Sequence, residues 1–284
     1  MNIKKNFTLI FSGVFILALL YVYIYSFNAE NEQPAQQRTV LVEKFTGTWC
    51  GWCPYGVEIL DNILDKTDNV VVLAYHTRDT DSMTIATTKV LQDAFDPKHP
   101  QAVIDRVQYP ETEKLPISRD DWDRTITYRL GAAPFLLIDI EGNYDPGSRK
   151  VDLDVKFQPG KDFLEGRYMI NFVITENGLK YTQKIFRDPD RKEIPGYIHN
   201  HVVREMVTGP TGMELKKKPT VIDDENVTIL EDMSYSFVID KEYIAENCHI
   251  VVFVHEDKGD GFGPVQNAAE ISIKVLAGFR HDNR

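Results

Sequence analysis

The chain has 284 residues, of which 43% are hydrophobic, and a formal net charge of −11 at pH 7. This length suits two domains, and the hydrophobic content is sufficient for packed cores, so a mainly disordered chain is excluded. The acidic balance argues against nucleic acid as a partner, because phosphate binding needs clustered lysine and arginine. The lysine triplet at 216–218 is expected to be a solvated loop.

The N-terminus is predicted to direct the chain to a membrane. Lys4 and Lys5 precede an apolar stretch from Phe7 to Phe27, which is long enough to span a bilayer. Because the two lysines stay on the cytoplasmic side, the remainder is expected to be exported to the periplasm or cell envelope. Residues 1–27 are therefore either a signal anchor or a cleaved signal peptide, and residues 28–38 a polar linker.

Two cysteines two residues apart, Cys50 and Cys53, form the most informative motif of the chain. An apolar run precedes them, apolar residues at helical spacing follow, and a buried-strand run covers 70–76. This order predicts a βαβ unit with the dithiol at the C-terminal edge of its first strand, where open α/β sheets carry their sites. Zinc is disfavoured, because a zinc site needs two further ligands at suitable spacing and the only other cysteine is Cys248, in the far half of the chain. Cys248 itself is expected to be a small buried residue.

With Trp49 directly before Cys50, this segment resembles the thioredoxin superfamily. At a helix N-terminus, Cys50 is expected to be the exposed, acidic thiol that acts as nucleophile, and Cys53 the shielded thiol that resolves the mixed disulfide. Trp49 and Trp52 are candidate substrate-binding residues that offer an apolar platform, with packing in the core as the alternative for Trp49. No cofactor and no metal are predicted.

The resemblance also implies a cis-proline loop facing the dithiol and a buried acid on the preceding strand. Pro100 and Pro134 compete for the proline role, and Pro100 is favoured because a predicted helix at 118–130 follows it. The acid belongs six residues before the first cysteine, where this chain has Lys44. Glu43, one residue earlier, serves as a catalytic acid only if a β-bulge shifts the register, and an exposed, unpaired Glu43 is the alternative.

From Ala133 onward, strand patterns replace helical ones. This change predicts an α/β thioredoxin-like domain over 39–131, expected to fold on its own, followed by an antiparallel β-sandwich domain over 132–284. His199 and His201 share one face if 199–207 is a strand, and they then either bind a metal or are structural. The strand candidates are 135–140, 150–156, 168–174, 179–185, 199–207, 234–239, 249–254 and 270–275.

Three segments together carry a second resemblance, which covers about residues 39–275: 43–54, with the dithiol, 101–106 and 197–209. They are similar to the Omp28-related outer-membrane proteins of Bacteroidota. That family implies an envelope location and the two-domain architecture, whereas its biochemical activity is poorly defined.

Two classes of function remain open. The first is a thiol-disulfide oxidoreductase whose partners are substrate or redox-partner proteins in the envelope, with the membrane contacted through the N-terminal segment. The alternative is a non-catalytic envelope binding or adhesion protein in which Cys50–Cys53 is a structural disulfide. The first is favoured, because a disulfide that closes so short a loop constrains the unfolded chain very little.

Overall fold

The computed structural model describes residues 37–159, 166–188, 190, 192–222 and 225–278. The predicted signal segment at 1–27 and nearly all of the predicted linker at 28–38 lie outside these residues. Within the described ranges, no helix is long and apolar enough to cross a bilayer.

The first part of the chain forms the predicted strand, helix and strand around the cysteines. β1 and β2 are seven residues each, are buried along their whole length and pair in parallel. Such runs suit strands that are covered on both faces. The elements of this part are β1 (Val40–Thr46), α2 (Cys53–Leu64), β2 (Val70–His76), α3 (Ala86–Phe95), β3 (Gln101–Ile104), β4 (Ile117–Ser118) and α4 (Trp122–Leu130).

The second part is rich in strands, and some of them continue the first sheet. The nine-stranded sheet has the order β16-β15-β7-β10-β2-β1-β3-β4, with β11 paired to β7. β10 joins β2 in parallel at Val202 and Ala74, and the Ala74 N–H donates to the His201 carbonyl at 2.8 Å. The elements are β5 (Leu136–Asp145), β6 (Lys150–Pro159), β7 (Tyr168–Glu176), β8 (Leu179–Lys184), β9 (Glu193–His199), β10 (Val202–Met206), β11 (Met213–Glu214), β12 (Lys217–Ile222), β13 (Glu225–Leu230), β14 (Met233–Val238), β15 (Cys248–Glu256), β16 (Val265–Ser272) and α5 (Ile273–Leu276).

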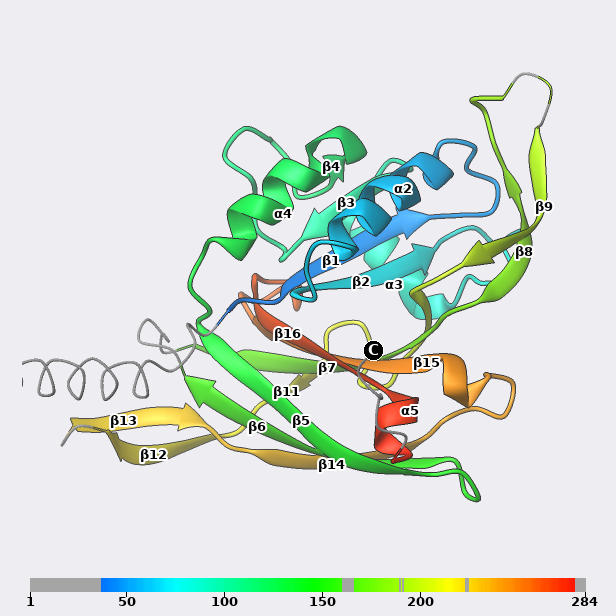
Figure 1. Ribbon diagram of the computed structural model, residues 1–284. Coiled ribbons are helices and arrows are strands. Elements are labelled where there is room, and N and C mark those ends of the chain that lie inside the picture. The colour runs from blue at the N-terminus through cyan, green and yellow to red at the C-terminus, as the bar shows by residue number, and fades with distance from the viewer. Residues whose placement is uncertain (1–36, 160–165, 189, 191, 223–224, 279–284) are drawn as a thin grey trace, which may run out of the picture. The chain divides into compact units, whose positions relative to one another are not determined.

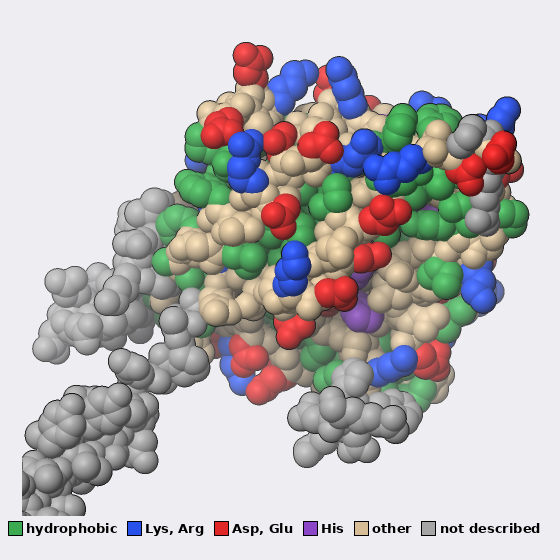
Figure 2. All heavy atoms as spheres, turned by 45° about the horizontal axis from the view of Figure 1, so that its top comes forward, with side chains coloured by type: hydrophobic (Ala, Val, Ile, Leu, Met, Phe, Trp, Pro, Cys, Tyr) green, Lys and Arg blue, Asp and Glu red, His purple; other side chains and the backbone are tan. Residues whose placement is uncertain are grey.

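Figure 1 shows the layers of this unit, and three apolar cores fill the space between them. The first lies between β1–β3 and the helices α2 and α4, where Gly56 allows close packing: a Cβ there would lie 2.9 Å from the Trp122 ring. The second lies between the opposite face of β1 and β2, α3, and strands β7, β15 and β16. The third lies between β7 and β15 and the three-stranded sheet β14-β6-β5. The face over α2 and α4 carries acidic and basic side chains interspersed (Figure 2).

Buried charges tie these layers together at the 101–106 segment. Asp105 accepts from Arg38 at 3.1 Å, from Arg129 at 2.8 Å and from the Leu41 N–H at 2.8 Å. Its carbonyl accepts from the Val265 N–H at 2.8 Å. This one residue therefore links β1, α4 and β16, which gives the 101–106 segment a structural role.

The prediction of a mixed α/β chain with a β-rich second half is confirmed. The division at residue 131 stays a prediction, although the described residues from Gln37 onward form one compact unit and the second core mixes side chains from both sides of that division. The strand expected at 199–207 is wrong in detail, because it breaks at His201, which has a φ of +58°. The strand expected at 270–275 ends at Ser272, where α5 begins.

Candidate functional site

The two cysteines form a disulfide at the junction of β1 and α2. Cys53 is the first residue of α2, and the Cα atoms of Cys50 and Cys53 are 5.4 Å apart. The Cys53 N–H donates to the Cys50 carbonyl at 3.1 Å, so the pair spans the turn that starts the helix. At this position the free N–H groups of a helix stabilise a thiolate.

Both sulfur-bearing residues are buried, which corrects the expectation that Cys50 is exposed. The exposed fraction is 5% for Cys50 and 2% for Cys53. The cover is an extended segment at the end of β8, whose backbone runs beside the motif. The Lys184 N–H donates to the Thr48 carbonyl at 2.8 Å, and the Phe186 N–H donates to the Gly51 carbonyl at 3.0 Å. The sequence could not indicate this cover, because the two segments are more than 100 residues apart.

Side chains of the same segment complete the cover. The Gln183 amide donates to the Cys50 carbonyl at 2.9 Å and to the Gly47 carbonyl at 3.3 Å. The Phe186 ring lies so close to Gly51 that a Cβ on this glycine would come within 2.4 Å of it. Its centroid is 6.0 Å from that of Trp52. The dithiol loop is therefore held by one continuous stretch of the second half of the chain.

The two tryptophans flank the disulfide in different environments. Trp52 is 44% exposed, as expected, and offers an apolar surface beside the cover. Trp49 is partly buried between the Arg78 guanidinium, 3.3 Å from its ring centroid, and the His99 ring at 4.9 Å. Their role in substrate binding stays a prediction.

The loop before β3 lies beside the start of α2. The His99–Pro100 peptide bond is cis, so Pro100 is the cis-proline that the sequence favoured over Pro134. A Cβ on Gly56 would lie 3.6 Å from the Cβ of Pro100, which places this loop against the first turns of α2. Its catalytic role stays a prediction.

The structure does not bring Glu43 to the disulfide. The pairing of β1 with β2 is unbroken from Val40 to Thr46, so the bulge that Glu43 required is not there. Glu43 instead points into the second core, where it accepts from Arg106 through two 2.8 Å hydrogen bonds and from the Tyr75 hydroxyl at 2.9 Å. Lys44, on the opposite face, is the charged residue of β1 that faces α2.

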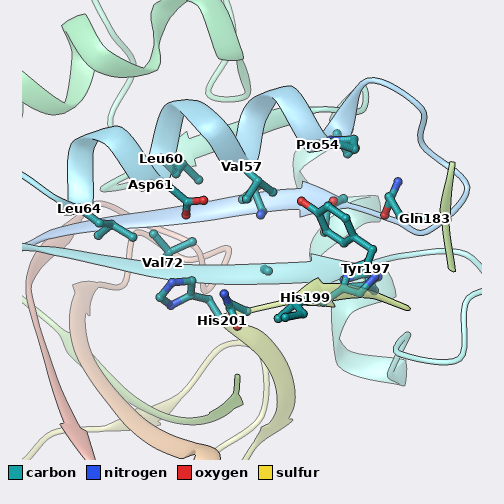
Figure 3. A pocket seen from close by; sticks show the side chains of 17 residues that line it. Pro54, Val57, Leu60, Asp61, Leu64, Val72, Gln183, Tyr197, His199 and His201 are labelled. Atoms are coloured by element: carbon teal, nitrogen blue, oxygen red, sulfur yellow. The ribbon is translucent and has the colours of Figure 1, made fainter. Parts of the chain in front are cut away.

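A cavity lies behind Cys53, between α2, β1 and β2 on one side and the end of β9 with the turn before β10 on the other (Figure 3). Its volume is about 20 Å³, enough for one water molecule. Asp61 projects into it from α2, with His199 and His201 on the opposite side (Figure 3). The lining residues with polar or titratable side chains are Lys44, Thr46, Cys53, Asp61, His76, Gln183, Tyr197, His199, Asn200 and His201.

Burial shifts the titration of several of these groups. It lowers the pKa of Lys44 to about 8, against the opposing effect of the Asp61 carboxylate. Burial, together with the nearby charge of His76, lowers the pKa of His199 to about 4, and burial likewise lowers that of His201 to about 4. At neutral pH both of these imidazoles are uncharged. The Nε2 atom of His199 is buried and has no hydrogen-bond partner among the described residues.

His76 and Asp81 form a buried pair at the edge of the cavity. The His76 Nδ1 and an Asp81 carboxylate oxygen are 2.8 Å apart, and Asp81 also accepts from the N–H groups of Thr48 and Met83. Burial alone would raise the pKa of Asp81, but these hydrogen bonds lower it to about 2. This pair fixes the loop that carries the cysteines.

Sequence reasoning named Lys44 as the residue at the acid position but missed the cavity around it. Alternation along β1 places Lys44 on the face of Val40 and Val42, which was the available signal for Lys44. His76 ends the predicted strand 70–76 and shares its face with Val72, so its place on the same side of the sheet as Lys44 could also have been predicted. His199 and His201 do not share a strand face, yet both line the cavity, and no three metal-ligating side chains cluster among the residues that the structure describes. Cys248 is buried, as expected.

The fold is similar to that of a known structure. HBP35 of Porphyromonas gingivalis matches with a TM-score of 0.66 and 18% sequence identity, over 89% of this chain and 80% of that chain. A domain of the outer membrane lipoprotein Omp28 from Porphyromonas gingivalis matches with a TM-score of 0.33 and 19% identity, over 50% of this chain and 90% of that chain. A search of curated proteins finds no match.

A family model supplies the assignment. The model of outer membrane protein Omp28 matches residues 89–274, which is more than half of the chain and begins after the cysteine motif. The family supports a location in the cell envelope and leaves the chemistry of the disulfide to be argued from this chain. On this match, the chain belongs to the Omp28 family of outer membrane proteins.

Proposed function

We propose that the protein is a thiol-disulfide oxidoreductase of the cell envelope, built on a thioredoxin-like first part. Cys50 is the nucleophile and Cys53 the resolving thiol. The observation that carries the proposal is the position of the disulfide: it closes the start of α2 at the end of β1, and Cys53 borders a small cavity lined by the Lys44 amine and by imidazoles.

The titratable side chains that line the cavity favour thiol-disulfide exchange over a purely structural role for the disulfide. Exchange requires that a thiol lose a proton before it attacks and that a leaving thiolate regain one. Burial of ionisable groups costs stability, and such groups cluster at functional sites. A disulfide that serves only to staple the chain gains nothing from the buried Lys44 and His199 beside it.

Access to Cys50 requires movement of the cover. In the exchange reaction, a substrate sulfur must approach Cys50 in line with the Cys50–Cys53 bond, and Gln183 and Phe186 occupy the space outside the motif. The cover is held to the loop by two backbone hydrogen bonds and by side-chain contacts, a modest set that can open locally. Protein substrates therefore react at a rate that depends on the opening of this segment.

The same burial supports a second candidate function. With both cysteines at most 5% exposed, the disulfide resembles a staple that fastens α2 to the cover. In this reading the protein binds a ligand in the envelope and the disulfide has no catalytic turnover.

A trapping experiment with Cys53→Ser separates the two functions. Attack by Cys50 on oxidised glutathione forms a mixed disulfide that only Cys53 resolves, so the purified Cys53→Ser variant should retain glutathione on Cys50. Wild type should resolve it to the intramolecular disulfide, and Cys50→Ser should retain much less. Mass spectrometry under non-reducing conditions distinguishes these species.

The same variant can then report partners. Non-reducing gels of envelope extracts should contain Cys53→Ser bands that collapse on reduction and that Cys50→Ser lacks. If neither single variant retains glutathione and wild type reacts with no disulfide substrate, the oxidoreductase proposal fails and the staple remains.

A further inference from the structure

Lys44 and Cys53 border the same small cavity. Lys44 lies on the face of β1 that looks toward α2, and Cys53 is the first residue of that helix. Lys44 is only 5% exposed, and its amine forms no ion pair in the part of the chain that the structure describes. Burial of an amine without a close counter-ion lowers the stability of the fold, and such groups are found preferentially at functional sites.

We propose that the Lys44 amine is the group that accepts the proton of the Cys53 thiol, directly or through one water molecule in the cavity. This inference rests on the proposed function, since it assigns a residue to the step in which Cys53 becomes a thiolate. The oxidoreductase proposal itself names no proton acceptor.

Several other groups face Lys44, and their states exclude them from this role. Asp61 comes from α2 and is exposed at the rim, while His76 is held by Asp81. His199 and His201 are bases of pKa about 4, too weak to take a proton from an ordinary thiol. Tyr197 is an acid whose pKa burial raises to about 12.

Lys44 is the group whose pKa is close to the ordinary pKa of the thiol that must lose its proton. With a pKa of about 8, its amine is close to the ordinary pKa of a cysteine thiol, so the proton can pass between them with little free-energy difference. His199 lines the same cavity, and its buried Nε2, which has no partner among the described residues, is available to a bridging water. The Asp61 carboxylate favours the ammonium form once it is made.

Exchange begins with a reduced protein and a disulfide substrate. Cys50 thiolate attacks one substrate sulfur, and the other leaves as a thiolate that takes a proton from solvent. Cys53 then gives its proton to Lys44 and attacks the Cys50 sulfur, so the Cys50–Cys53 bond forms and the second substrate thiolate leaves. The substrate gains two electrons and the dithiol loses them. In reverse, Lys44 ammonium returns its proton to the departing Cys53 thiolate.

The test follows the Cys53 thiolate directly, in Cys50→Ser protein, by its absorbance near 240 nm from pH 5 to 9.5. Burial raises the pKa of Cys248 to about 12, so Cys248 stays protonated and the signal belongs to Cys53. Protein with both Cys50 and Cys53 changed to serine supplies the baseline. Added Lys44→Met should move the titration midpoint up by about one pH unit or more, and Lys44→Gln should do the same.

Two further variants complete the test: one is a control for the loss of a lysine, and the other separates proton transfer from the effect of charge. Lys66→Met removes an exposed lysine from the turn after α2 and should leave the midpoint unchanged. Lys44→Arg keeps a positive charge that cannot be neutralised, so in a protein with both cysteines it should slow resolution of the glutathione mixed disulfide roughly 10- to 100-fold near pH 8.

Unchanged midpoints in Lys44→Met and Lys44→Gln, or normal resolution in Lys44→Arg, would overturn the assignment. The titration in Cys50→Ser protein needs no exchange reaction, so it tests Lys44 even if the protein proves inactive toward disulfides. Failure of the glutathione trapping would instead overturn the oxidoreductase proposal.

Discussion

Glu43 and Lys44 are neighbours in β1, and both are buried, but they face opposite sides of the sheet. Glu43 is fully paired, with two hydrogen bonds from Arg106 and one from Tyr75, inside an apolar core. Lys44 borders a small cavity with an exposed carboxylate at its rim and a cysteine on the facing helix. A buried charge with every partner in place holds layers together, whereas one left without a close partner points to chemistry.

A fragment that ends at residue 131 tests the Glu43 side most severely. It keeps α2 and α4 over Lys44 but exposes the Glu43 face, which β7, β15 and β16 cover in the whole chain. We expect a fragment of residues 37–131 to show no cooperative thermal transition by circular dichroism, because its second core is half removed. A sharp transition would show that this face needs no cover and would support the independent domain that the sequence suggested.

Removal of one charge from the Glu43 pair has the next largest effect. Glu43→Gln leaves the Arg106 guanidinium buried beside a neutral amide, which should lower the free energy of unfolding by about 3–5 kcal/mol. Urea denaturation measures the loss, and Glu58→Gln on the exposed face of α2 is the matched control. A cost no greater than that of the control would mean that the pair does not hold the layers.

Lys44→Met should instead raise the free energy of unfolding at neutral pH. Burial lowers the pKa of Lys44 from 10.5 to about 8, so the unfolded chain binds more protons between these values and wild-type stability rises with pH across that window. The full effect is roughly 3 kcal/mol, as an upper bound. Lys44→Met should therefore be more stable than wild type near pH 7, and the difference should shrink as the pH approaches 10.

The pH dependence isolates Lys44 from other groups. Urea denaturation of wild type and Lys44→Met at a series of pH values gives the difference directly, and Lys66→Met should show no such trend. A constant difference across the series would contradict the lowered pKa and with it the contrast between the two faces.

The smallest effect is expected at the cover of the disulfide. Phe186→Ala removes the ring that packs on Gly51 and Trp52, a contact worth on the order of 1 kcal/mol. The disulfide should then be reduced by dithiothreitol about two- to tenfold faster, with Val238→Ala on β14 as the control for an exposed apolar residue. If the rate stays that of wild type, opening of this segment does not limit access to Cys50.

Local patterns in the sequence predicted the elements around the disulfide. The uninterrupted apolar run at 70–76 and the apolar spacing after Cys53 predicted β2 and α2, and residue alternation placed Glu43 and Lys44 on opposite faces. The order of elements after each proline favoured Pro100. These inferences needed only short stretches of chain, in which propensity and periodicity dominate.

The contacts between distant segments could not be predicted. The pairing of β10 with β2, the partners of Glu43 and the cover formed by Gln183 and Phe186 all join residues more than 30 positions apart in sequence. The sequence of a Glu next to a Lys in a strand does not reveal whether either side chain has an ion-pair partner. The exposure predicted for Cys50 was wrong for this reason, because no pattern in the sequence of the covering segment indicates that it packs on the cysteine loop.

The reduction potential of the Cys50–Cys53 pair tests the central claim most directly. Equilibration of the purified protein with glutathione and dithiothreitol redox buffers, followed by alkylation and mass spectrometry, gives this value. The account predicts a potential between about −270 and −120 mV, the range of pairs that exchange with substrates. A potential below about −300 mV, typical of structural disulfides, would contradict it and would leave the disulfide as a staple for α2.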